Sequence, residues 1–151
     1  MKRNEFLSKL GIGAAIICAG SLLDACGGGD SAEPNNNNGG NNGNPLNFTL
    51  NIDTDLPNVG SSKTKQGVIV VRTANAVVAS SFVALEAVCP HEHGSIFYDG
   101  TNNRLECSLH QSRYQLDGAV INGPVNASGS TRTLKKYKIE ITGNIMTVTD
   151  L

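Results

Sequence analysis

Two short pairs of cysteine and histidine constrain the fold of this chain more than any other feature. Cys89-Pro90-His91 and Cys107-Ser108-Leu109-His110 can each be supplied by one turn, and fifteen residues separate His91 from Cys107. The intervening segment has strand-like runs at 95–98 and 104–106 around the turn signal Asp99-Gly100. This pattern predicts a hairpin-like excursion that brings the two pairs together.

The donor atoms in these pairs suit a metal site. Thiolates and imidazoles are concentrated here, because all three histidines of the chain (His91, His93 and His110) lie within 20 residues of one another. Two cysteines and two histidines can hold one tetrahedral zinc ion. They can equally hold a two-iron, two-sulfide cluster with the cysteines on one iron and the histidines on the other. The residue types alone leave both options open.

The spacing C-x-H…C-x-x-H resembles that of the Rieske iron–sulfur family, and the similarity covers roughly residues 66–150. The stretch 110–114 (HQSRY) resembles the family's H-G-S-x-Y segment, with Gln111 in place of the usual glycine. Asp117-Gly118 and Gly123-Pro124 resemble the downstream turn and the proline loop that shields the cluster. The resemblance therefore extends beyond the metal ligands.

The resemblance implies a role for each matching residue. Cys89 and Cys107 would ligate the inner iron of one [2Fe-2S] cluster per chain, and His91 and His110 the outer iron, nearer solvent. Gly123 and Pro124 would form the shielding loop.

Ser112 and Tyr114 match the two positions that donate hydrogen bonds to cluster sulfurs in high-potential members of the family. Such bonds stabilise the more negative reduced state, so they raise a potential that spans roughly −150 to +300 mV in these centres.

Two departures from the family pattern lie in the same loops. Respiratory members usually join their loops by a disulfide, but the corresponding positions here are Gly94 and Leu109. Ferredoxin-type and oxygenase members also lack this disulfide, so its absence and the Ser112–Tyr114 pair point in different directions. His93 replaces a usual glycine, and we expect either an exposed imidazole or an extra protonatable group beside the cluster there, rather than a further ligand. Glu92 and Glu106 flank the expected ligands, and we expect both carboxylates to be solvated.

Outside these loops, the sequence from Leu46 onward has the short apolar runs of an all-β domain. Residues 48–52 and 137–141 alternate apolar and polar side chains, and Val68–Val71 reads as a buried strand. Gly143-Asn144 predicts a hairpin that returns through residues 145–148. Further strands are expected in four shorter runs, at 82–88, 96–98, 104–107 and 119–121. We expect an antiparallel sandwich or barrel over residues 46–151, with a loop-rich cluster-binding insert at about 88–125.

The N-terminal region is predicted to contain an export signal followed by a linker. Residues 1–25 have a basic start and an apolar run of 14 residues at 10–23, which is typical of a signal peptide and short for a membrane span. Leu23-Asp24-Ala25-Cys26 resembles the bacterial lipobox, so Cys26 is the expected lipidation site. Residues 3–7 (RNEFL) also resemble a degenerate twin-arginine signal. The remaining stretch, 27–45, holds 7 Asn, 6 Gly and 2 Pro, which predicts a disordered linker.

The charge composition excludes one class of function. The net charge of −1 argues against a nucleic-acid binder that relies on positive charge. The preferred hypothesis is an exported bacterial lipoprotein that resembles the Rieske subunit of cytochrome bc-type complexes. It would pass single electrons from a quinol or a reductase to a cytochrome-like acceptor, by itself or within an oxidoreductase, and an exposed histidine ligand could take up a proton with the electron. A ferredoxin that feeds an oxygenase and a structural zinc module are the alternatives.

Overall fold

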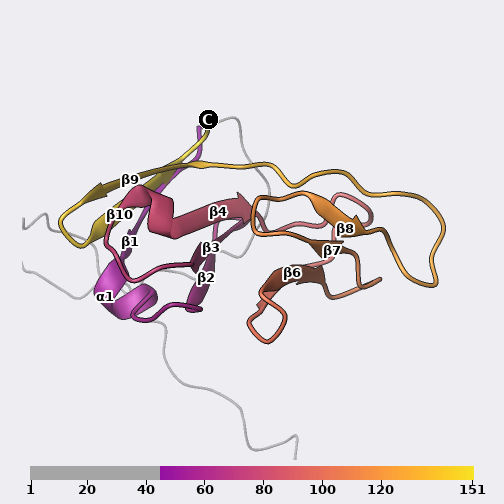
Figure 1. Ribbon diagram of the computed structural model, residues 1–151. Coiled ribbons are helices and arrows are strands. Elements are labelled where there is room, and N and C mark those ends of the chain that lie inside the picture. Colours follow the sequence, from indigo (N-terminus) through magenta and orange to yellow (C-terminus); the bar gives the residue numbers. More distant parts are fainter. Residues whose placement is uncertain (1–44) are drawn as a thin grey trace, which may run out of the picture. The chain divides into compact units, whose positions relative to one another are not determined.

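The computed structural model describes residues 45–151 (Figure 1). The predicted signal peptide, the predicted lipidation site Cys26 and the predicted linker as far as residue 44 lie outside the described residues. Within the described part of the chain, no helix is both long enough and apolar enough to cross a membrane.

The described residues are organised as three antiparallel sheets, which confirms the predicted all-β class. The sheets have the strand orders β1-β10-β9, β2-β3-β4 and β5-β6-β7-β8. The elements, in chain order, are β1 (Asn47–Asn51), α1 (Ile52–Asp55), β2 (Ser62–Lys65), β3 (Val68–Arg72), the 3-10 turn η1 (Ala79–Ser81), β4 (Phe82–Glu86), β5 (Ile96–Asp99), β6 (Arg104–Cys107), β7 (Arg113–Tyr114), β8 (Val120–Asn122), β9 (Lys138–Thr142) and β10 (Ile145–Thr149).

Strand β3 is buried along its whole length because it separates two cores. Its even-numbered valines, Val68 and Val70, face the distal core, which also contains apolar side chains of β1 and β10. Its odd-numbered residues, Ile69 and Val71, face a second core. We call it the site-side core, because it contains Cys89, Cys107 and Tyr114. Successive side chains of a strand point to opposite faces of the sheet. A strand that lies between two cores therefore needs apolar residues at every position.

The two hairpins beside these cores have two-residue turns. Gln66 and Gly67 both adopt positive φ (49° and 77°) between β2 and β3, as a type I′ turn requires. Gly143 adopts φ 59° between β9 and β10, where the sequence predicts the turn. The predicted strands at 68–71, 96–98 and 104–107 are present with small changes of boundary.

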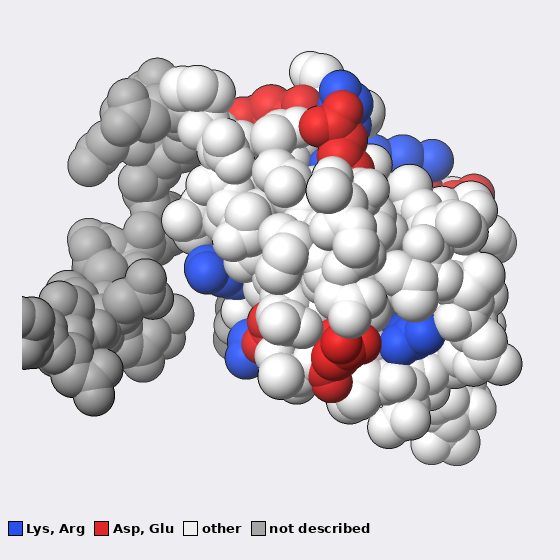
Figure 2. All heavy atoms as spheres, turned by 90° about the vertical axis from the view of Figure 1, so that its left-hand side faces the viewer, with Lys and Arg blue, Asp and Glu red and all other residues white. Residues whose placement is uncertain are grey.

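Four elements were not expected from the sequence: α1, the edge strand β2, the 3-10 turn η1 and the two-residue strand β7. Strand β2 has no apolar residue, and it forms because the hairpin turn places it against β3. Figure 2 shows the end of the domain that carries α1 and the β9–β10 hairpin. This face has only small, scattered groups of charged side chains.

Candidate metal centre

The two predicted ligand loops repeat one backbone geometry. In the first loop, the Cys89 N–H donates to the carbonyl of Gly94 (2.7 Å) and the His93 N–H donates to the carbonyl of Cys89 (2.9 Å). The first loop therefore closes on Cys89 and fixes the position of its side chain.

The second loop makes the equivalent pair of bonds. The Cys107 N–H donates to the carbonyl of Ser112 (2.9 Å), and the Gln111 N–H donates to the carbonyl of Cys107 (3.1 Å). A further bond, from the Ser108 N–H to the Ser95 carbonyl (2.9 Å), ties this loop to the chain that follows the first one. The hairpin-like excursion predicted from the sequence is thus present as β5–β6, with one loop before it and one after it.

The two cysteines are buried and free, with exposed fractions of 0% for Cys89 and 2% for Cys107. Burial acts to raise the pKa of the Cys89 thiol, but the Tyr114 hydroxyl and the backbone N–H groups of His91 and Glu92 favour the thiolate, and its pKa lies below the usual value. Burial and the neighbouring Cys89 raise the pKa of Cys107. Thiolate is the form that binds metal, and the surroundings of Cys89 favour that form.

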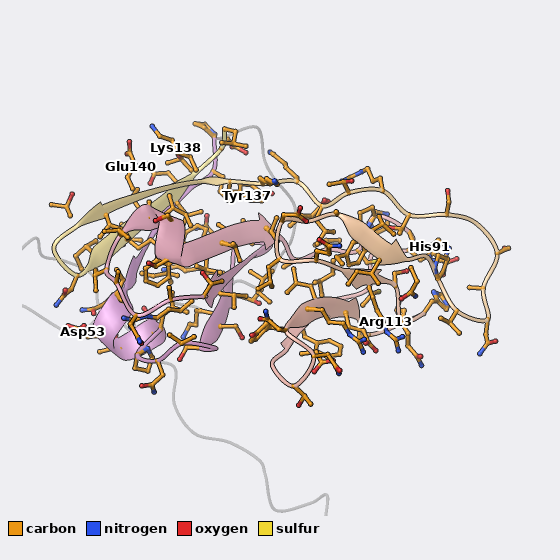
Figure 3. All side chains as sticks on the ribbon, viewed as in Figure 1. Asp53, His91, Arg113, Tyr137, Lys138 and Glu140 are labelled. Carbon is orange, nitrogen blue, oxygen red and sulfur yellow. The ribbon has the colours of Figure 1, made fainter. Side chains whose placement is uncertain are left out.

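The two histidines lie beside each other at the end of the site-side sheet, and Figure 3 labels His91 there. Their ring centroids are 5.2 Å apart. The Nε2 atom of His91 lies 2.8 Å from the carbonyl oxygen of Ser128, which can only accept a hydrogen bond. Nε2 therefore carries the proton, which leaves Nδ1 of His91 with a free lone pair for a metal.

In His110, as in His91, Nδ1 is the ring nitrogen left available for a metal. Its Nδ1 atom is buried and has no hydrogen-bond partner among the described residues, the nearest acid being Glu92 at 3.7 Å. The side chain of His110 is 27% exposed, whereas that of His91 is 7% exposed. His110 is therefore the more accessible of the two rings.

Ser112 and Tyr114 both lie against the site. The Ser112 side chain is fully buried, and its Oγ atom has no partner in the described part of the chain. The Tyr114 hydroxyl lies 3.4 Å from Cys89 Sγ and 2.7 Å from the Oγ1 atom of Thr131. Burial and the bond to Cys89 raise the pKa of Tyr114 to about 12, so at neutral pH the phenol keeps the proton that it can donate to sulfur.

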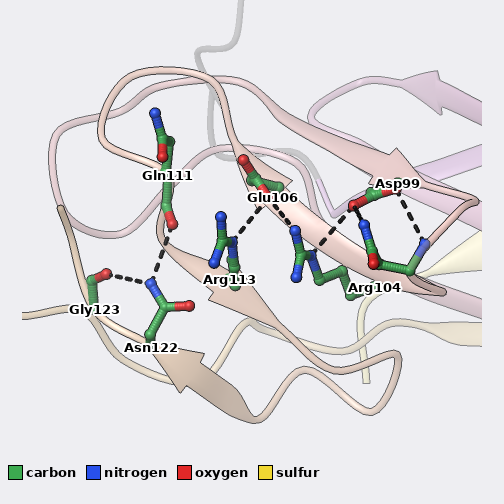
Figure 4. A network of polar contacts seen from close by, with 8 residues as sticks. Asp99, Arg104, Glu106, Gln111, Arg113, Asn122 and Gly123 are labelled. Atoms are coloured by element: carbon green, nitrogen blue, oxygen red, sulfur yellow. Dashed lines mark hydrogen bonds and ion pairs between the residues drawn. The ribbon is translucent and has the colours of Figure 1, made fainter.

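A third segment, residues 122–131, covers the two loops. The Val125 N–H donates to the His110 carbonyl (2.7 Å), directly after the predicted shielding residues Gly123 and Pro124, which are half-buried. The Asn122 side chain donates to the carbonyls of Gln111 (3.2 Å) and Gly123 (2.8 Å), as drawn in Figure 4. The sequence pointed to the first residues of this segment only. Ser128 and Thr131, which reach the site from its far end, stand in a short polar stretch with no motif to single them out.

Two acidic residues beside the ligands differ in their surroundings, although both were expected to be solvated. Glu92 is 57% exposed and lies 3.8 Å from His91 Nε2. The Glu106 side chain is 16% exposed and pairs with Arg104 and Arg113 at 3.0 Å each (Figure 4). For Glu106 the expectation was wrong, because β6 and β7 place two arginines beside it.

The position of a possible disulfide between the loops is occupied by other atoms. A Cβ atom added to Gly94 would lie 2.8 Å from Leu109 Cγ and 2.8 Å from Cys107 Sγ. Positions 94 and 109 are thus in contact, and a leucine side chain packs over a glycine where the respiratory family members have two cysteines.

Comparison with known proteins identifies the family. The Rieske [2Fe-2S] domain family matches residues 52–138, which is 87 of the 151 residues. The chain belongs to the Rieske [2Fe-2S] family. A comparison with curated proteins finds no significant match. The Rieske assignment makes the chain a one-electron carrier with one [2Fe-2S] cluster, and the zinc alternative is thereby set aside.

A solved structure of a Rieske protein has the same fold. The chain is similar to the cyanobacterial plasma membrane Rieske protein PetC3 from Synechocystis PCC 6803, with 23% identity, a TM-score of 0.51, and coverage of 68% of this chain and 97% of that one. It is also similar to the ferredoxin of carbazole 1,9a-dioxygenase from Nocardioides aromaticivorans IC177, with 20% identity, a TM-score of 0.49, and coverage of 71% and 98%.

The site residues fit a Rieske cluster chemically. Two buried thiols, one imidazole nitrogen left free by its tautomer and one buried imidazole nitrogen without a partner make two sulfur and two nitrogen donors. The buried Ser112 hydroxyl also fits, because it has no partner among the described residues and a cluster sulfide could accept a hydrogen bond from it.

Proposed function

We propose that Cys89, His91, Cys107 and His110 are the four cluster ligands. Their support is the donor set described above, held by two loops of the same geometry. When bound, a Rieske cluster takes up and releases one electron at a time. The protein fixes the His91 tautomer through Ser128, buries both thiols, and leaves the edge of His110 open to a partner.

Single substitutions test the ligand assignment. Cys107→Ala and His110→Ala should each abolish the visible absorption and the electron paramagnetic resonance (EPR) signal of the reduced cluster. His93→Asn is the matched control, because His93 is exposed and Asn also tolerates its positive φ of 57°. An intact EPR signal in either ligand variant, with full iron content, would contradict the assignment.

We further propose that the carrier is of the high-potential kind and accepts electrons from a quinol or a reductase. The observation that carries this proposal is the Tyr114 hydroxyl, 3.4 Å from Cys89 Sγ, together with the buried Ser112 hydroxyl. Hydrogen bonds to sulfur favour the reduced, more negative state, so this pair raises the potential. A cytochrome-like protein is the expected acceptor.

The tuning pair is tested by redox titration of variants. Tyr114→Phe and Ser112→Ala should each lower the midpoint potential, whereas Ser108→Ala, an exposed serine in the same loop, should leave it unchanged. If both tuning variants kept the wild-type potential, the proposal would fail.

A lipid at Cys26 is the proposed membrane tether, with the domain on the periplasmic or outer face. The lipobox-like stretch before Cys26 and the apolar run at 10–23 support it. Cys26→Ser should move the protein from the membrane fraction to the soluble fraction and prevent incorporation of labelled fatty acid. Cys18→Ser is the matched control, and a Cys26→Ser protein that stayed lipidated would refute the tether.

The alternative function is a ferredoxin-type carrier that feeds an oxygenase. One observation favours it: the contact between Gly94 and Leu109 replaces a disulfide between the loops. The two functions differ in potential, so a midpoint near or below roughly −100 mV would select the ferredoxin type.

A further inference from the structure

The Tyr114 hydroxyl has two neighbours and only one proton. It lies 3.4 Å from Cys89 Sγ and 2.7 Å from Thr131 Oγ1, within a side chain that is fully buried. A metal-bound thiolate accepts hydrogen bonds and cannot donate them. Tyr114 can therefore donate to Cys89 only if Thr131 donates to Tyr114 rather than accepting from it.

The surroundings of Thr131 favour this direction. Among the hydrogen bonds of residues 45–151, Thr131 Oγ1 has one partner, the Tyr114 hydroxyl. Its proton has no competing acceptor among the described residues, so the phenol oxygen is the protein atom to which Thr131 can donate a hydrogen bond. The phenol proton is then directed toward Cys89, and the three groups form a chain from Thr131 to Tyr114 to sulfur.

The chain segment that carries Thr131 is held at the site by a second contact. Three residues earlier, the Ser128 carbonyl lies 2.8 Å from His91 Nε2. A Cβ atom added to the intervening Gly129 would lie 3.2 Å from the same His91 nitrogen, so the segment packs closely on this ring. Thr131 is thus placed by the covering segment and not by the ligand loops themselves.

We propose that Thr131 is a positioning residue that aims the Tyr114 proton at Cys89 Sγ and thereby raises the reduction potential of the cluster. This inference rests on the proposed ligand and tuning roles of Cys89 and Tyr114. Hydrogen bonds in a chain polarise one another and gain roughly 10–30% in strength per bond. Removing the Thr131 hydroxyl should therefore cost about a tenth to a third of the potential shift that Tyr114→Phe causes.

The test is a double-mutant cycle read out as midpoint potential, on the full chain with its cluster. Thr131→Val, which keeps the shape and removes the hydroxyl, should lower the potential, and Thr131→Ser should restore it. In a Tyr114→Phe background, Thr131→Val should add no further shift. Thr131→Ala serves as the second hydroxyl-free variant if Thr131→Val does not retain the cluster.

Three results would overturn the inference. Thr131→Val at the wild-type potential would show that the hydroxyl has no effect on the cluster. A rise in potential would show that Thr131 accepts the tyrosine proton in competition with Cys89. An equal shift with and without the tyrosine hydroxyl would show that Thr131 acts by another route. If Tyr114→Phe itself caused no shift, the proposed tuning role would fail first, so the two failures are distinguishable.

Discussion

His93 and Gln111 occupy the same place in the two ligand loops, four residues after the cysteine. Both adopt left-handed backbone conformations, with φ of 57° and 54°, at positions where the family usually has glycine. In this region a non-glycine residue destabilises the folded state by roughly 1–2 kcal/mol relative to glycine. Glycine in turn loses about 0.5–1 kcal/mol more conformational entropy on folding, which offsets part of its advantage.

His93→Gly and Gln111→Gly should therefore each raise the free energy of unfolding by about 0.5–1 kcal/mol. Chemical denaturation of the cluster-loaded protein measures this change. Ser108→Gly in the same loop is the control and should not stabilise the protein. Equal or lower stability in both loop variants would show that the side chains of His93 and Gln111 offset the backbone strain.

Gly94 is required by contact and not by backbone angle, since its φ is not in the left-handed range. A methyl group there would lie 2.8 Å from Cys107 Sγ, closer than real Cβ contacts occur. Gly94→Ala should therefore lower the cluster content per chain, as measured by iron and sulfide analysis. Gly100→Ala is the control, because a Cβ there meets only the Tyr98 ring, at an ordinary 3.5 Å, and normal cluster content in Gly94→Ala would contradict the close approach.

At the scale of elements, a row of charges stabilises the sheet that holds the second ligand loop. Glu106 on β6 bonds Arg104 on the same strand and Arg113 on β7, and Arg104 also pairs with Asp99 on β5 (3.3 Å) (Figure 4). These ion pairs link three adjacent strands, one residue before the proposed ligand Cys107. A partly buried carboxylate with two guanidinium partners contributes more than an exposed pair.

Glu106→Gln should lower the free energy of unfolding by about 1–2 kcal/mol. Glu140→Gln, which removes one exposed pair with Lys138, should change it by less than about 0.5 kcal/mol. Denaturant unfolding at two salt concentrations provides the comparison. If the two variants were equally stable, the network would add nothing to the sheet.

The elements also show how far sequence patterns reach. The run Val68–Val71 predicted a buried strand correctly, because burial on both faces demands continuous apolar residues. Strand β2 could not be predicted, because Ser62–Lys65 has no pattern of its own and pairs only through the Gln66-Gly67 turn. The cysteine and histidine pairs were visible as motifs, since the chemistry lies within each short loop. Thr131 and Ser128 were not, because their contacts depend on how an irregular segment folds back over the site.

For the domain as a whole, Asp150 ties the two ends of the described chain together and links them to Lys135, which lies between the covering segment (122–131) and β9. Its carboxylate accepts the Leu46 N–H (2.8 Å) and the Lys135 ammonium (2.6 Å). The Lys135 hydrogen bond, followed by the Leu46 N–H, holds the pKa of Asp150 below its usual value of 3.8. A carboxyl group whose pKa is lower in the folded state stabilises that state above the unfolded pKa, and this contribution disappears as the pH falls through the folded pKa.

Asp150→Asn should therefore be less stable than wild type at pH 6–7, and the difference should shrink as the pH falls below about 4. Thermal unfolding midpoints of both proteins across this range measure the effect. A difference that stayed constant down to the most acidic samples would rule out the charge as its origin.

For the molecule as a whole, we propose that the two loops hold a Rieske cluster whose potential is raised by Ser112 and Tyr114. An EPR-monitored redox titration of the full chain tests it most directly. We predict a rhombic signal in the reduced state, with a midpoint well above 0 mV within the family range of roughly −150 to +300 mV. A midpoint near or below roughly −100 mV would contradict the high-potential assignment, and the absence of the signal in iron-loaded protein would contradict the site itself.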